Sequence, residues 1–193
     1  RFPLVWKPSE SSSAQGVRYI HNSQELAALR AGYHGESYVL QEYVNGFGAG
    51  YSVLSHEGKI LAACGHRRRA EWPVTGGSSM IRSYFEHPDM ERIAARVMEH
   101  TQWSGVAMFE FKITRENAAR LIEVNPRMWG SLYQSIASGV NFPLLLFQPE
   151  LANSVAIRKD RVTYYSPHHL RSLLYYVLKQ GDFGPLFFLL SNA

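Results

Sequence analysis

Two stretches in the middle of the chain alternate between polar and apolar side chains with the period of a β-strand, and they constrain the fold more than any other feature. The first covers residues 106–112, in which Glu110 lies on the polar face. The second runs from Leu121 to Gly130, and in its first half Glu123 and Asn125 share a face. Because the connection between the stretches is short and polar, together they predict a β-hairpin.

In this hairpin two carboxylates are expected to face each other. Pairing Ile113 with Arg120 would put Glu110 directly opposite Glu123, and like charges in that position destabilise a strand pair. A divalent cation between them removes the penalty, and magnesium prefers the oxygens that Glu110, Glu123 and Asn125 supply. A solvated surface hairpin is the alternative, but the apolar flanks and the Pro-Arg-Met-Trp-Gly turn that follows favour a metal site.

Composition indicates a globular protein that binds an anion. The chain has 193 residues, 46% of them hydrophobic and 13% aromatic, which is enough for a core in one domain or two small lobes. The net charge of +4 fits an anionic ligand such as a nucleotide. Cys64 is the only cysteine, so no internal disulfide framework can form, and a reducing, cytoplasmic location is expected.

The ends of the chain predict that it is a piece of a longer protein. It begins at Arg1 without an initiator methionine and stops soon after the apolar run 185–190. That run is far shorter than the roughly 20 residues that span a membrane, so no membrane segment is expected.

The first segment predicts a phosphate-binding loop between two strands, Leu4–Lys7 and Val17–Ile20. Lys7 stands where the first strand enters a serine-rich loop that ends at Gly16, a composition whose backbone N–H groups can surround phosphates. A solvated surface loop is the alternative. A capping box at Asn22–Glu25 then predicts a helix, and Tyr38–Val44 predicts a further strand.

An arginine-rich segment follows a predicted hairpin whose strands, Gly50–His56 and Lys59–Gly65, meet at a Glu-Gly turn. The sequence of residues 66–79 predicts an active-site loop, with arginines that hold a substrate carboxylate and a glycine-serine run that offers N–H donors. The substrate-binding candidates are Arg67, Arg69, Gly76, Gly77 and Ser78. A solvated edge and a nucleic-acid-binding role for the three consecutive arginines are the alternatives, although no longer basic stripe supports the second.

Helices are predicted for 88–102, 130–138, 142–151 and 168–179. The first is amphipathic, with Met90, Ala94 and Met98 on one face, and Pro88 suits its first turn.

Several of these residues carry a family resemblance. Glu110 within Phe-Glu-Phe-Lys, followed by Glu123-Val-Asn-Pro-Arg127, resembles the metal and phosphate signature of the ATP-grasp ligases. Residues 66–78 resemble the corresponding loop of uncharacterised ATP-grasp carboxylate–amine ligases. The resemblance implies an α+β fold, the ATP-grasp fold, with two lobes, antiparallel sheets and the nucleotide between the lobes.

The resemblance also implies roles for single residues. Lys7 and Gly16 would contact the phosphates of ATP, and Arg127 would hold the transferred phosphoryl group or the acylphosphate. Glu110, Glu123 and Asn125 would bind two Mg2+ ions, with Mn2+ as an alternative metal. The hinge that meets the adenine base would consist of Gln41, Glu42, Tyr43 and Val44.

The implied reaction is ATP-dependent ligation of a carboxylate and an amine through an acylphosphate. The expected partners are these two small molecules, a missing N-terminal domain of the same chain and, as an open option, a second copy in a homodimer. The expected domains are a small lobe (1–46), a large lobe with the metal hairpin (47–151) and a helical extension (152–193). A phosphotransferase and a non-catalytic nucleotide-binding module are the alternatives.

Overall fold

The computed structural model describes residues 1–10, 15–35, 37–72, 77–165 and 168–192. The chain forms two compact units, Arg1–Val44 (unit 1) and Asn45–Ala193 (unit 2). Both units contain antiparallel sheets and helices, which confirms the predicted α+β class.

Unit 1 is a three-stranded antiparallel sheet with the strand order β2-β1-β3 and one helix. Its elements are β1 (Leu4–Pro8), β2 (Arg18–Ile20), α1 (Ser23–Gly32) and β3 (Tyr38–Glu42). The predicted cap at Asn22 is present, because its side chain accepts a hydrogen bond from Glu25 N at 2.9 Å. The Glu25 carboxylate reaches back one residue further than in a capping box and accepts from His21 N at 2.8 Å. The helix therefore begins where the sequence indicates.

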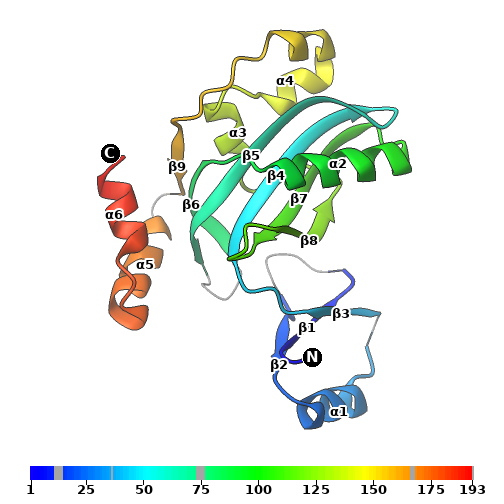
Figure 1. Ribbon diagram of the computed structural model, residues 1–193, viewed down its shortest axis with the longest axis vertical. Helices are drawn as coiled ribbons and strands as arrows, with labels where there is room; N and C mark the ends of the chain where they lie inside the picture. Colours follow the sequence, from blue (N-terminus) through cyan, green and yellow to red (C-terminus); the bar gives the residue numbers. More distant parts are fainter. Residues whose placement is uncertain (11–14, 36, 73–76, 166–167, 193) are drawn as a thin grey trace. The chain divides into compact units, whose positions relative to one another are not determined.

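Unit 2 is built on a six-stranded antiparallel sheet with the order β8-β7-β4-β5-β6-β9 (Figure 1). Its strands are β4 (Phe47–His56), β5 (Lys59–Trp72), β6 (Ser78–Tyr84), β7 (Gly105–Ile113), β8 (Ala119–Asn125) and β9 (Val162–Tyr164). Its helical segments are α2 (Pro88–Thr101), α3 (Leu132–Ala137), α4 (Phe142–Phe147), η1 (Pro149–Ser154), α5 (His168–Tyr175), η2 (Tyr176–Gln180) and α6 (Gly184–Leu190).

The two faces of this sheet have separate cores. Helix α2 covers one face, where its buried Met90, Ala94 and Met98 join a cluster with Phe109 and Phe111 of β7 (Figure 1). On the opposite face, residues on and around α3 and α4 pack against β4, β5 and β7. Because α3 and α4 are short, they leave the β7–β8 end of that second face for polar side chains.

The arginine-rich segment is a strand rather than the predicted loop. Strand β5 continues through His66 to Trp72 and pairs with β6, with irregular register around Arg68 and Ala70. Polar residues fall on both faces of this strand, so alternation does not reveal it. Residues 73–76 lie outside the described residues.

The C-terminal part also differs from the prediction in detail. Helix α4 ends at Phe147, before the predicted limit, because Gln148 precedes a proline and the residue before proline is disfavoured in an α-helix. Within residues 152–193, which were expected to be helical, β9 extends the sheet beside β6. None of the helices in the described ranges has the length and apolar character that crossing a membrane requires.

Gly50 provides a test of the packing between strand β4 and the buried ring of His66 on β5. An added Cβ at Gly50 would lie 2.3 Å from Cε1 of His66, whose side chain is buried. We therefore expect Gly50→Ala to lower the free energy of unfolding by about 1–3 kcal/mol, as overpacking does. Urea unfolding measures this. Gly130→Ala is the control, because nothing lies within 4 Å of its Cβ position; equal stability of the two variants would contradict this packing.

Candidate functional site

The β7–β8 hairpin brings the two predicted metal carboxylates opposite each other. Ile113 pairs with Ala119, one residue away from the predicted partner, but a bulge at Ile122 restores the offset. Glu110 and Glu123 are therefore cross-strand partners, as expected, although the register that produces this pairing was predicted wrongly. Directly opposite side chains on a ladder share one face of the sheet, so a single cation can reach both carboxylates.

Asn125 and Arg127 complete this end of the hairpin. Asn125, the last residue of β8, is buried, and its Oδ1 atom accepts a hydrogen bond from Nη2 of Arg127 at 3.0 Å. The second guanidinium nitrogen, Nη1, donates to the carbonyl of Met128 at 3.0 Å. These two bonds hold the arginine beside Asn125 while its side chain remains exposed. The Asn125 oxygen keeps a second lone pair for another partner.

These residues fit a metal ion that is coordinated partly by the protein and partly by a nucleotide. Within the described part of the chain, no three His, Cys, Asp or Glu side chains are grouped so as to hold a metal ion. The protein ligands here would be two carboxylates and one amide oxygen, from Glu110, Glu123 and Asn125. Magnesium commonly uses one or two carboxylates and fills its remaining positions with phosphate oxygens and water.

Arg68 lies beside these residues and was not among the predicted site residues. Its Nε lies 3.1 Å from Oε1 of Glu71, its Nη1 lies 3.5 Å from Oε2 of Glu110, and its Nη2 donates to the carbonyl of Gly77. The missing side chain of Gly48 makes room, because an added Cβ there would lie 2.7 Å from Cδ of Arg68. Had residues 66–72 been read as a strand, the alternation would have separated Arg68 from its two arginine neighbours.

The two arginines that were predicted to bind substrate contact aromatic rings. The Arg67 guanidinium carbon lies 3.8 Å from the ring centroid of Phe47, and that of Arg69 lies 4.1 Å from the ring centroid of Phe188. Arg69 also donates from Nε to the Ser83 hydroxyl at 2.9 Å. Gly77 is buried and Ser78 begins β6, whereas Gly76 lies outside the described residues. A substrate-binding role for these residues stays a prediction.

Burial determines the ionisation of two other residues near this site. Burial and, to a smaller extent, the charges of Arg82 and Arg68 lower the pKa of His66 to about 3, so this imidazole is neutral at physiological pH. Burial also raises the pKa of the Cys64 thiol to about 11. The thiol is therefore protonated at neutral pH, as expected for a core cysteine that does no chemistry.

Unit 1 places its candidate residues on one sheet and the turn beside it. Lys7 lies on β1 opposite Val39, and Gly16 adopts a positive φ of 74° just before β2. Strand β3 ends at Glu42, two residues before the predicted end of this strand. The backbone N–H of Tyr43 donates to the Pro3 carbonyl at 3.3 Å, so it is bonded toward β1.

This bond determines the direction of the neighbouring backbone groups. Hydrogen-bonded positions alternate along an antiparallel strand, so the amide and carbonyl of Glu42 point away from β1. That direction suits a contact with the edge of a base. Gln41 lies opposite Val5, and Val44, the last residue of unit 1, is half-buried.

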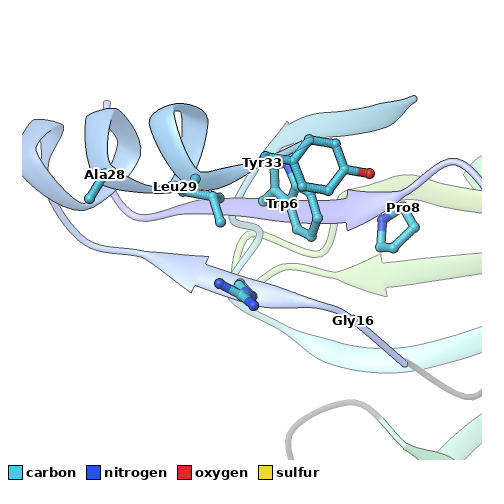
Figure 2. A pocket seen from close by; sticks show the side chains of 8 residues that line it. Trp6, Pro8, Gly16, Ala28, Leu29 and Tyr33 are labelled. Atoms are coloured by element: carbon cyan, nitrogen blue, oxygen red, sulfur yellow. The ribbon is translucent and has the colours of Figure 1, made fainter. Parts of the chain in front are cut away.

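A hollow of about 280 Å³ lies in unit 1, between helix α1 and the face of the sheet that carries Trp6 (Figure 2). Trp6 of β1 forms its floor, with Ala28 and Leu29 of α1 and Tyr33 around it (Figure 2). Because Trp6 and Lys7 are successive residues of one strand, their side chains point to opposite faces. The hollow therefore lies on the face opposite Lys7, whereas Gly16 is among the residues that line it.

Comparison with known proteins assigns the chain to a family. Residues 34–168 match the model of a family described as "ATP-grasp in the biosynthetic pathway with Ter operon". This match covers well over half of the chain, and the chain therefore belongs to this ATP-grasp family. Comparison with curated proteins gave no match.

Solved structures show the fold. The biotin carboxylase domain of 2-oxoglutarate carboxylase from Hydrogenobacter thermophilus, solved with MgADP, ADP and bicarbonate, gives a TM-score of 0.58 at 16% identity over 88% of this chain and 39% of that one. D-alanine–D-alanine ligase from Bacillus anthracis gives 0.53 at 22% identity over 79% of this chain and 54% of that one.

L-amino acid ligase from Bacillus licheniformis gives a TM-score of 0.52 at 22% identity over 84% of this chain and 43% of that one. The predicted ATP-grasp fold is confirmed by these likenesses. The chain spans from about two fifths to just over half of the length of these three proteins.

The ion pair between Arg68 and Glu71 tests how the site is held together. Their side chains are only 16% and 10% exposed, whereas the pair of Asp89 and Arg92 lies at the surface although its 2.6 Å distance is shorter. Because Glu71→Gln leaves a buried guanidinium without its nearest carboxylate, we expect a loss of about 1–3 kcal/mol in the free energy of unfolding.

Asp89→Asn is the control, and it should lower the stability less, because solvent screens the surface pair. Urea unfolding of both variants shows whether burial or the distance between the charged atoms determines how much an ion pair contributes to stability. A larger loss for Asp89→Asn would show that burial does not set the strength of the Arg68 pair.

Proposed function

We propose that this chain is the ATP- and magnesium-binding part of a ligase that joins a carboxylate to an amine, or to another nucleophile, through an acylphosphate. The observation that carries the proposal is the cross-strand pairing of Glu110 with Glu123 in a member of the ATP-grasp family. Two opposed carboxylates beside Asn125 and Arg127 are a poor choice for stability alone. The same arrangement is suited to binding a cation that also contacts a triphosphate.

Each residue of the hairpin has a part in this proposal. Glu110 and Glu123 supply carboxylate oxygens to magnesium, and Asn125 supplies the amide oxygen that Arg127 already orients. These three residues would hold magnesium, and the metal would supply positive charge against the phosphate oxygens. Arg127, exposed and held by Asn125 and the Met128 carbonyl, places a fixed positive charge where a phosphoryl oxygen can bind.

The reaction needs no nucleophile from the protein. The attacking group is the substrate carboxylate, so the protein contributes positioning and charge neutralisation. The single cysteine is buried with a protonated thiol, in keeping with that division of roles. The residues of the hairpin thus account for the chemistry without an additional catalytic side chain.

Unit 1 would contribute the rest of the nucleotide site. Lys7 would bind the phosphate chain together with Gly16, at the turn before β2. The outward-pointing amide and carbonyl of Glu42 support a contact with the edge of adenine, with Gln41, Tyr43 and Val44 around the base.

The named activities of similar proteins support the reaction class. D-alanine–D-alanine ligase and L-amino acid ligase are among the solved proteins with this fold. The carboxylase domain was solved with MgADP, which supports ATP and magnesium as ligands here. A phosphotransferase would stop at the phosphorylated product, so an amine-dependent product distinguishes the ligase from it. A non-catalytic module would bind Mg·ATP without any turnover.

A substitution at Glu123 separates folding from metal binding. Glu123→Gln removes the carboxylate repulsion, so we expect the metal-free protein to be unchanged or stabilised by a few tenths to about 1 kcal/mol. The same change removes a charged ligand, so the affinity for Mg·ATP should fall at least about tenfold, and turnover further. Thermal melts and calorimetry measure the two effects.

The control for Glu123→Gln is Glu116→Gln, which removes the same charge from the exposed turn of the same hairpin. It should leave the affinity for Mg·ATP unchanged. A Glu123→Gln protein that is less stable and binds Mg·ATP normally would reject the metal site.

A substitution at Lys7 tests the phosphate contact. We expect Lys7→Ala to weaken ATP binding at least about tenfold while the affinity for adenosine stays within about twofold, because the lysine charge acts on phosphate alone. Calorimetry with both ligands measures the difference, and Arg30→Ala on the exposed side of α1 controls for loss of positive charge. Equal weakening of ATP and adenosine would mean that Lys7 is structural.

A further inference from the structure

Arg82 is a buried cation that forms no ion pair with a carboxylate of the described residues. It lies on β6 with a side chain that is almost wholly covered, the residue being 4% exposed. Its Nη2 donates to the Ser79 carbonyl, and its Nε atom has no hydrogen-bond partner among the described residues. No ion pair involves Arg82 in the part of the chain that the structure describes.

A second cation lies directly opposite. Arg82 is the cross-strand partner of Arg68, so both guanidinium groups lie on the same face of the sheet. Burial and, to a smaller extent, the charge of Arg68 lower the pKa of Arg82 to about 10. Arg82 therefore stays protonated at neutral pH. The neighbouring imidazole of His66 is neutral at this pH, so it neither adds to nor balances the charge of the two arginines.

The nearby carboxylates do not balance both guanidinium groups. Glu71 is paired with Arg68, and Glu110 approaches Arg68 at 3.5 Å but belongs to the proposed metal site. When magnesium occupies Glu110, that carboxylate is no longer a counter-ion for arginine. A buried charge without a partner is costly, so this cluster has the electrostatics of a site that an anion completes.

We propose that Arg68 and Arg82 form the binding site for the carboxylate of the acyl substrate. This inference rests on the proposed ligase function and adds the residues that hold its first substrate. Arg68, partly exposed, would contact the carboxylate. Arg82, more deeply buried, acts as a positioning residue that supplies charge from the neighbouring strand.

The position of Arg68 suits this role. Its guanidinium lies beside Glu110, so a carboxylate bound to it lies next to the proposed metal ligands. Glu71 and the Gly77 carbonyl hold the side chain in place before any ligand arrives, which reduces the entropy lost on binding. The terminal phosphate of ATP is the other source of an anion here, and we favour the carboxylate because Arg127 and Lys7 are already assigned to phosphates.

The test uses acetate, the smallest carboxylate with an acyl carbon, at constant ionic strength against chloride. Acetate should raise the melting temperature of the native protein more than chloride does, and Arg68→Gln should abolish this difference. Arg92→Gln, which changes a surface arginine on α2, should retain it. Mg·ATP affinity, measured separately by calorimetry, should change less than about threefold in Arg68→Gln.

Arg82→Met provides the second measurement. If no group of the fold compensates Arg82, replacing it by an apolar side chain should raise the melting temperature of the ligand-free protein by about 2–4 °C and weaken the acetate effect at least about threefold. An Arg82→Met protein that melts lower, or does not fold, would show that the fold itself uses this charge and would overturn the proposal.

The remaining outcomes are also decisive. An acetate effect that is equal in the native protein, Arg68→Gln and Arg92→Gln would be non-specific and would overturn the carboxylate site. Loss of Mg·ATP affinity in Arg68→Gln, with the affinity for Mg·ADP retained, would assign the site to the terminal phosphate instead. Failure of the native protein to bind Mg·ATP would reject the proposed function, while the acetate comparison would still report on the arginine pair.

Discussion

The opposition of two like charges across the β7–β8 ladder is the constraint on which the rest of this site depends. Glu110 and Glu123 repel each other, and the neighbouring groups reduce that repulsion or make use of it. Arg68 leans toward Glu110 from β5, and Arg127 follows Asn125 at the end of β8. Arg68 is also held by Glu71 and the Gly77 carbonyl, and Arg127 is held by Asn125 and the Met128 carbonyl.

The glycines of β4 explain how this arrangement fits on the sheet. Strand β4 runs between β5 and β7, and any side chain at Gly48 or Gly50 would collide with Arg68 or with the ring of His66. The core of unit 2 lies on the α2 face and under α3 and α4, which leaves this end of the sheet for charged groups. Stability is thus provided by one part of the sheet and charge is concentrated in another.

Much of this could be predicted from sequence where the signal is local. The helix cap at Asn22, the amphipathic α2 and the alternation around Glu110 each depend on neighbouring residues, and each prediction is confirmed. The bulge at Ile122 was not predictable, because a register is set by the whole ladder. The first half of β5 was predicted, but its continuation from His66 to Trp72 was missed because arginines fall on both faces, and the pairing of Arg68 with Arg82 was missed with it.

The most direct test of this account is calorimetry of ATP binding to the native protein, with magnesium and then with excess chelator. If Glu110, Glu123 and Asn125 hold a metal together with the triphosphate, the affinity should be at least about tenfold higher with magnesium. Equal affinity in the two conditions would mean that the opposed carboxylates do not hold a metal, and the central claim would be wrong.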